Sequence, residues 1–257
     1  MWSASAFALA ISMAAAAGLV GCFAVMRKMT LASDAISHVA LPGIAVAVAL
    51  RVHPLLGGLA ALLLGTLLIW ALQHKTRMST ETVIGVVFSA ALAVGSVLAS
   101  GEELLDALLG NPGSLRGWEA GVGVAGALAV VAFVVAARNR LVVALVSADI
   151  ARTAGVDVAR LDLLYLVAFA CTVGLGLRYL GVLLMGSLII IPAATAKHVA
   201  RGLREMLAVS VAVAIASTVL GGILAGWLHR ATGPIIIIVA AAFFFASLAR
   251  RGGSARS

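Results

Sequence analysis

An aspartate and a histidine, Asp34 and His38, stand four residues apart at the head of a segment that is otherwise largely apolar. Residues at positions i and i+4 share one face of a helix, so the carboxylate and the imidazole would project side by side. Ionisable groups inside a hydrophobic helix are costly, which makes this pair a candidate for a functional role. One oxygen donor and one nitrogen donor together suit a borderline divalent cation such as zinc or manganese.

Two donors do not complete the four-coordinate site that zinc favours, so further ligands would come from water, another helix or a second copy of the chain. An incomplete site suits a transported ion, because the ion must leave again. The structural alternative is that Asp34 and His38 hydrogen-bond to each other or to a neighbouring helix. Ser37, between them, is interpreted as a helix-packing hydroxyl.

The composition places this pair in a membrane. Of the 257 residues, 63% are hydrophobic and 11% are charged, whereas charged residues make up about a quarter of a soluble domain. The net charge of +8 does not indicate nucleic-acid binding, because the basic residues flank apolar segments and form no basic domain. Cys22 and Cys171 lie within apolar runs and suggest packing rather than a disulfide framework.

Apolar segments that could each cross a bilayer follow one another along the chain. They predict an all-α fold, a single polytopic transmembrane bundle over residues 1–257 with about nine spans. An eight-span arrangement follows if the sixth and seventh segments form a re-entrant pair. A basic tail at residues 250–257 is expected to be disordered. The predicted spans cover about residues 4–26, 31–50, 52–74, 82–101, 120–137, 163–177, 179–196, 206–229 and 231–249.

Prolines occur inside two of these spans, at Pro42, which is followed by Gly43, and at Pro192. A proline lacks the backbone donor and clashes with the carbonyl four residues earlier, which for Pro42 is that of His38. The sequence therefore predicts helix breaks at these positions, with a kink beside the Asp34–His38 pair.

The longest polar connection, residues 138–162, contains a pattern typical of a short helix from Ser147 to Val156 that ends at Gly155. The lysines and arginines are distributed unevenly among the predicted loops. The odd-numbered loops and the C-terminal tail contain 14 of the 18. The positive-inside rule then places these loops and the C-terminus in the cytoplasm, and the N-terminus outside. The four basic residues on the other side are Arg51, Arg116, Arg178 and Arg230.

Several catalytic motifs are absent from the sequence. It has no HExxH zinc-protease motif and no GxxxxGK[ST] phosphate-binding loop, and it has no GxSxG nucleophile motif. The chain is therefore not expected to be an enzyme, and any ATP that drives it must bind another subunit. Two GxxxG pairs, Gly117/Gly121 and Gly222/Gly226, predict tight packing within the chain or, failing that, a dimer seam.

The chain resembles, over nearly its whole length, the membrane permease of bacterial ABC importers for divalent metals, the zinc, manganese and iron uptake group. Residues 33–43 are similar to the family segment GDAxSHxxLPG, although Ser33 replaces a glycine. A second departure is that residues 229–232 lack the acidic residue usual before the last span. The other matching segments are residues 85–89, 149–156, 181–196 and 232–234.

The resemblance implies a type II ABC importer permease that forms a homodimer around a central path in the bacterial cytoplasmic membrane. Two ATP-binding cassette subunits would dock below, and a periplasmic or lipid-anchored metal-binding protein would deliver the ion. Asp34 and His38 match the family's path-lining metal contacts. Residues 147–158 match its coupling helix, in which Asp149, Ala151, Gly155 and Val156 carry the likeness.

No permanently bound cofactor is expected from this resemblance, and zinc, manganese or iron would be the cargo. Two alternatives stay open at this point. The chain could be a secondary metal transporter or channel that works without ATP, or a membrane scaffold that transports nothing.

Overall fold

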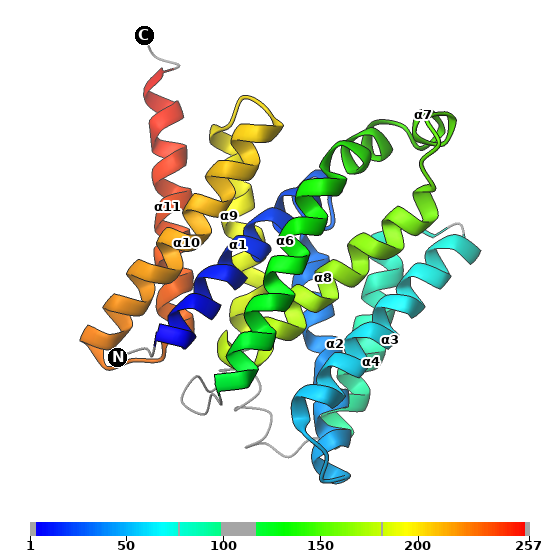
Figure 1. Ribbon diagram of the computed structural model, residues 1–257, viewed down its shortest axis with the longest axis horizontal. Coiled ribbons are helices and arrows are strands. Elements are labelled where there is room, and N and C mark those ends of the chain that lie inside the picture. The colour runs from blue at the N-terminus through cyan, green and yellow to red at the C-terminus, as the bar shows by residue number, and fades with distance from the viewer. Residues whose placement is uncertain (1–3, 77, 99–116, 181, 255–257) are drawn as a thin grey trace.

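The computed structural model describes residues 4–76, 78–98, 117–180 and 182–254. Within these ranges the side chains of residues 4, 30–34, 117, 118, 178–180, 182–184 and 250–254 lie outside the description. The described part of the chain contains helices and no strand (Figure 1), so the all-α prediction is confirmed. Its helices are α1 (Ala4–Met26), α2 (Thr30–Ala49), α3 (Pro54–Lys75), α4 (Thr80–Leu98), α6 (Gly117–Val146), α7 (Ala148–Thr153), α8 (Val158–Leu180), α9 (Val182–Val199), α10 (Leu203–Leu228) and α11 (Thr232–Ser254).

Every predicted span coincides with one of the long helices, and α7 is the predicted short helix. Seven described helices are long and apolar enough to cross a membrane. The described apolar stretches of α2 and α9 are shorter, Ala35–Ala49 and Met185–Val199. The chain is therefore a multi-span membrane bundle.

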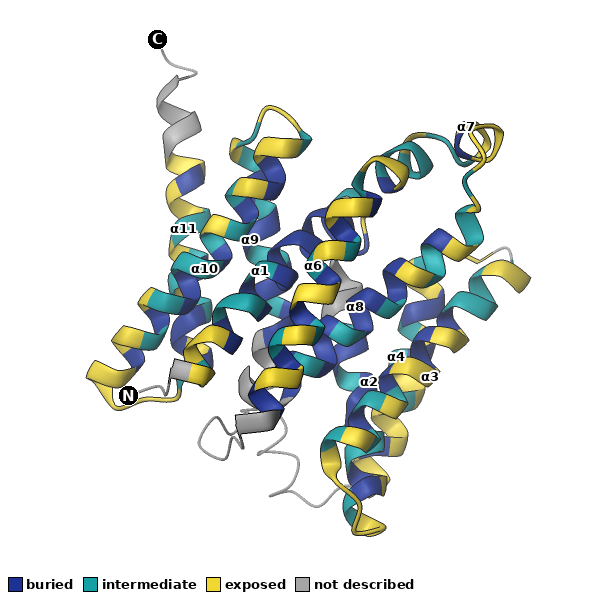
Figure 2. Cartoon of the chain, viewed as in Figure 1, coloured by how far each residue is buried: buried dark blue, intermediate teal, exposed yellow. Residues whose placement is uncertain are grey.

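The first helix forms the centre of the bundle. Leu9, Met13 and Phe23 of α1 are fully buried, and α1 packs against α6, α9 and α10. Figure 1 shows α9, α10 and α11 on one side of α1 and α2, α3 and α4 on the other. The exposed residues lie mostly on the peripheral helices (Figure 2), where large apolar side chains such as Leu64 and Ile223 face outward as lipid contact requires.

Neither proline breaks its helix, so the predicted helix breaks are wrong, whereas the kink expected beside His38 stays a prediction. The helix α2 runs without interruption through Pro42 and Gly43, and α9 continues through Pro192 to Val199. A proline forfeits one backbone hydrogen bond, and neighbouring helices in a membrane protein tolerate that loss. Pro42 has such a neighbour, because it lies against Gly95 of α4.

Two helix ends also differ from the prediction. The helix α6 continues through Arg138 and Arg140 to Val146, where a polar connection was expected. Charge ends a membrane span but not a helix, because a helix that leaves the bilayer keeps its own hydrogen bonds. Likewise α11 extends to Ser254, so the disorder predicted from residue 250 is wrong as far as that residue. Residues 255–257 lie outside the described ranges.

The closest approach between α2 and α3 occurs at two glycines. A methyl group on Gly43 would meet the carbonyl oxygen of Gly57, and a methyl group on Gly57 would meet that of Gly43. Val39 of α2 lies about one turn before Gly43, and its side chain contacts Gly65 of α3. Backbone contact at Gly43 and Gly57, together with the contact of Gly65 with the Val39 side chain, makes α2 and α3 a close pair along much of their length.

The second glycine of each GxxxG motif, Gly121 and Gly226, does not provide such a contact. Among the described residues, nothing lies within 4 Å of the position that a side chain would take at Gly121 or Gly226. The predicted packing within the chain is therefore wrong for these two glycines. Instead, Gly221 lies against Ile236 of α11 and Gly21 lies against the backbone of Ile189.

Candidate metal site and coupling surface

The helix α2 holds His38 at the edge of the core. Its neighbours Ile36, Val39 and Ala40 are buried, and α2 packs most extensively against α3 and α4. The imidazole of His38 is itself half-buried. Its ring centroid lies 5.7 Å from that of Phe88 on α4, with the two planes tilted by 56°. A phenyl ring thus covers part of the imidazole from one side.

Asp34 belongs to the same helix, one turn before His38. Its side chain lies outside the described part of the structure. The uninterrupted helical backbone from Asp34 to His38 supports the i, i+4 spacing on which the prediction depends. Ser37 is fully buried, as expected for a hydroxyl that packs between helices.

The described side chains of one chain do not supply a complete metal site. Among them, no cluster of three or more histidines, cysteines, aspartates or glutamates has metal-binding geometry. His53, His74 and His229 are exposed at helix ends, as predicted. His53 Nε2 lies 3.9 Å from Oε1 of Glu119 at the start of α6. Any site that combines His38 with two or more such side chains therefore needs donors from beyond the described ones.

The short helix α7 projects from one end of the bundle (Figure 1). Ser147 caps its N-terminus by accepting a hydrogen bond from the backbone N–H of Ile150 at 3.3 Å. Gly155 ends it with φ of +77°, a left-handed conformation that glycine adopts without strain. The predicted helix from Ser147 to a terminating glycine is confirmed.

The four residues predicted to couple to an ATPase divide into two pairs. Asp149 and Gly155 lie on the surface, and the Asp149 carboxylate pairs with Arg152 at 2.9 Å. Ala151 is fully buried and Val156 packs against the core, so these two hold α7 in place from beneath. The outward apolar residues of this region are Val146 and Ile150, which are 78% and 59% exposed.

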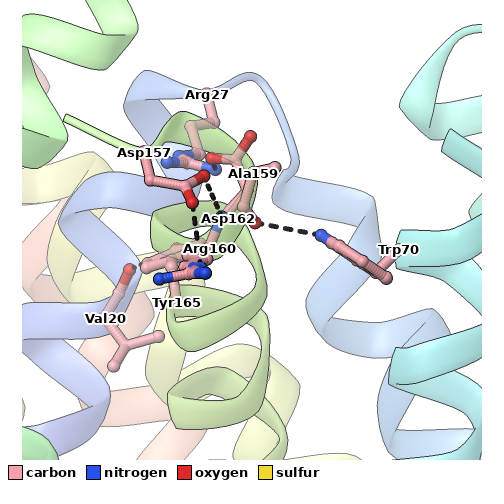
Figure 3. Close-up of polar contacts among 8 residues, drawn as sticks. All are labelled: Val20, Arg27, Trp70, Asp157, Ala159, Arg160, Asp162 and Tyr165. Atoms are coloured by element: carbon pink, nitrogen blue, oxygen red, sulfur yellow. Dashed lines mark hydrogen bonds and ion pairs between the residues drawn. The ribbon is translucent and has the colours of Figure 1, made fainter. Parts of the chain in front are cut away.

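Sequence reasoning missed a polar network at the start of α8, shown in Figure 3. Arg27, just past the end of α1, forms an ion pair with Asp162 at 2.8 Å. The Arg27 guanidinium also lies 4.5 Å from the centre of the Tyr165 ring. The Tyr165 hydroxyl donates to the carbonyl of Val20, and Trp70 Nε1 donates to that of Ala159, each at 3.0 Å. No sequence spacing relates residues this far apart.

These features define a class of protein. A multi-span helical bundle with an ionisable helix position at the edge of its core, and a short helix that projects at one end, is typical of a membrane transport protein.

The family follows from comparison with known proteins. The ABC 3 transport family matches residues 2–251, and the chain belongs to that family. It is therefore a transport component rather than an enzyme, as the sequence indicated. The ATP-independent transporter or channel is set aside by the same finding.

Relatives and a solved structure agree with this assignment. The chain is 27% identical over 241 residues to the high-affinity zinc uptake system membrane protein ZnuB of Haemophilus influenzae, covering 90% of this chain and 91% of that one. It is 29% identical to the manganese import system permease protein ScaB of Streptococcus parasanguinis, covering 90% and 84%. The structure of PsaBC from Streptococcus pneumoniae in complex with Fab matches with a TM-score of 0.81 and 28% identity over 95% of this chain and 89% of that one.

Proposed function

We propose that this chain is the permease of an ABC importer that carries a divalent metal ion, zinc or manganese and, less favoured by these relatives, iron. The observation that carries the proposal is the half-buried imidazole of His38, one turn after Asp34 on a helix that is otherwise apolar. The relatives named for zinc uptake and manganese import support the same cargo. A nitrogen and an oxygen donor suit both ions.

The permease would act as a homodimer with two ATP-binding cassette subunits below and a metal-binding protein above. The described side chains of one chain form no cluster of three ligands, and a second copy would add another Asp34 and His38 to a shared site, which supports a dimer. Coordination by only a few protein donors per state allows the ion to be released.

We infer nine spans, with the N-terminus outside and the C-terminus in the cytoplasm. In Figure 1 α1 begins at one end of the bundle, whereas α11 ends at the other, together with α7. An odd number of crossings is needed for such an arrangement, and the long helices number nine among the described residues. The basic loops fall on the side of α7, which supports a cytoplasmic location for that end.

Transport would follow alternating access. ATP binding closes the ATP-binding subunits, the two coupling helices α7 move with them, and the two permeases tilt about the shared path. The metal then meets a site whose affinity differs between the two states, and that difference biases the direction of movement.

The experiment that tests this function is ATP-dependent uptake by the purified complex in liposomes. The permease is reconstituted with the ATP-binding subunit that co-purifies with it, and radioactive zinc and manganese are supplied together with the matching metal-binding protein. Uptake of at least one ion that needs ATP supports the proposal. ATP hydrolysis without any metal uptake would contradict it.

A first prediction concerns the docking surface on α7. We expect Ile150→Asp to weaken association with the ATP-binding subunit about tenfold or more, because a charge replaces an exposed apolar side chain at the centre of the contact. Co-purification and binding to the isolated subunit measure the effect. Val52→Asp, at a position 49% exposed in the connection between α2 and α3 and outside both helices, serves as a control for apolar-to-charged change, and similar losses in both variants would argue against docking at α7.

A second prediction concerns Phe88. We expect Phe88→Ala to raise the metal concentration for half-maximal uptake about two- to tenfold, because an aromatic contact is worth about 0.5–1.5 kcal/mol and its loss frees the imidazole of His38. Phe245→Ala on α11, where the ring is 65% exposed, is the matched control. An unchanged half-maximal concentration in Phe88→Ala would show that the ring does not support the site.

A further inference from the structure

The start of α8 is joined to α1 through a partly buried charge. Arg27 Nη1 and Asp162 Oδ1 lie 2.8 Å apart, and their side chains are only 12% and 27% exposed. The guanidinium stacks over Tyr165, which is fully buried and donates its hydroxyl proton to the Val20 carbonyl. Three contacts therefore fix the first two turns of α8 to the last turns of α1 (Figure 3).

The same segment of α8 is joined to α3. Trp70 Nε1 donates a hydrogen bond to the carbonyl oxygen of Ala159 at 3.0 Å, and the indole packs against the core. Figure 3 shows the indole reaching from α3 to the beginning of α8. A displacement of this end of α8 would therefore act on both α1 and α3.

The connection between α7 and α8 is short and closely hydrogen-bonded. The backbone N–H groups of Ala154, Gly155 and Val156 donate to carbonyls of α7 at 2.9–3.0 Å. Asp157 then caps α8 by accepting from the N–H of Arg160 at 3.0 Å. With so few residues between the two helices, α7 cannot move far without moving the start of α8.

The path continues from α3 to the helix that carries His38. Gly65 of α3 lies against Val39, the residue after His38, and Gly57 meets Gly43 backbone to backbone. Closely packed helices transmit displacement because no gap is available to absorb it.

We propose that Arg27, Asp162 and Trp70 are positioning residues that carry the movement of α7 to α1 and α3, and through α3 to His38. The proposal rests on the proposed function and adds a named route to it. It assigns no metal contact to these residues.

A nearby pair of residues provides a matched control. Arg160 and Asp157 form an ion pair at 2.9 Å, almost the same length as that of Arg27 and Asp162. Their side chains are 84% and 52% exposed and belong to one turn of the chain, so the pair links α8 to no other helix. Arg160→Gln should therefore leave coupling unchanged.

The test measures ATP hydrolysis and metal uptake in the same liposomes, with the complex assembled on each permease variant. Trp70→Phe keeps an aromatic ring but removes the N–H donor together with the five-membered ring of the indole, whereas Asp162→Asn keeps the shape and removes the charge. We expect both variants to hydrolyse ATP at close to the wild-type rate but to move about threefold to tenfold less metal per ATP. The double variant Arg27→Asp with Asp162→Arg exchanges the two charges and keeps an ion pair. It should recover part of the metal moved per ATP that Asp162→Asn loses.

The outcomes separate this inference from the proposed function. Wild-type uptake of zinc or manganese, and its loss in His38→Ala, test the function itself. A ratio of metal to ATP that stays at the wild-type value in both Trp70→Phe and Asp162→Asn would overturn the inference, even while transport proceeds. Because Trp70→Phe removes no charge, it reports on the route even if Asp162→Asn destabilises the protein.

Discussion

We expect His38→Ala and Asp34→Ala each to lower uptake of zinc and manganese by about tenfold or more at wild-type protein levels. Even side chains that only support a metal ligand alter affinity or activity by about 10–100-fold when removed, and a direct ligand should matter at least as much. The helix α2 runs without interruption past both positions, so alanine there leaves the backbone intact. Initial rates of radioactive zinc and manganese uptake in liposomes measure the effect.

His229→Asn is the matched control for this prediction. His229 is exposed at the end of α10 and has φ of +51°, a conformation that asparagine accepts more readily than alanine. It should transport at the wild-type rate. If the Asp34 and His38 variants also transport at that rate, the site assignment is wrong, and if His229→Asn is equally impaired, the loss reflects general damage.

The sequence could predict the helices because the bilayer constrains them physically. A membrane span must be apolar and must satisfy its own backbone hydrogen bonds, so a long charge-free stretch indicates a helix. The predicted helix end was wrong where this constraint no longer applies. At Arg138 and Arg140 the helix α6 continues beyond its apolar part, although the sequence indicated a polar connection there. The predicted helix break at Pro42 was also wrong, because the effect of a proline depends on neighbours such as Gly95.

The candidate site was predictable only in its local part. The spacing of Asp34 and His38 follows from helix periodicity, and Gly155 ends α7 as its backbone freedom indicates. Phe88 and the pairing of Arg27 with Asp162 depend on tertiary contacts between distant segments. Local periodicity contains no information on such contacts. The same reason explains why GxxxG spacing at Gly121 did not identify a helix crossing.

We expect Gly43→Ala to destabilise the permease by about 3 kcal/mol or more, which is at the upper end of the usual cost of overpacking. The added methyl group would meet the carbonyl oxygen of Gly57 and the side chain of Ala61. Backbone cannot rotate away as a flexible side chain can, so α2 and α3 would have to separate. The separation would also move Pro42 relative to Gly95 on α4. Reversible unfolding in mixed detergent micelles, followed by circular dichroism, measures the loss.

Gly85→Ala is the matched control, because it makes the same chemical change inside α4 where nothing described lies within 4 Å. Alanine is the better helix former by about 1 kcal/mol, so this variant should be as stable as wild type or slightly more stable. The difference between the two variants isolates the cost of parting α2 from α3. Equal stabilities would mean that the two helices do not meet at Gly43 and Gly57, and the route from α3 to His38 would then lose its closest contact.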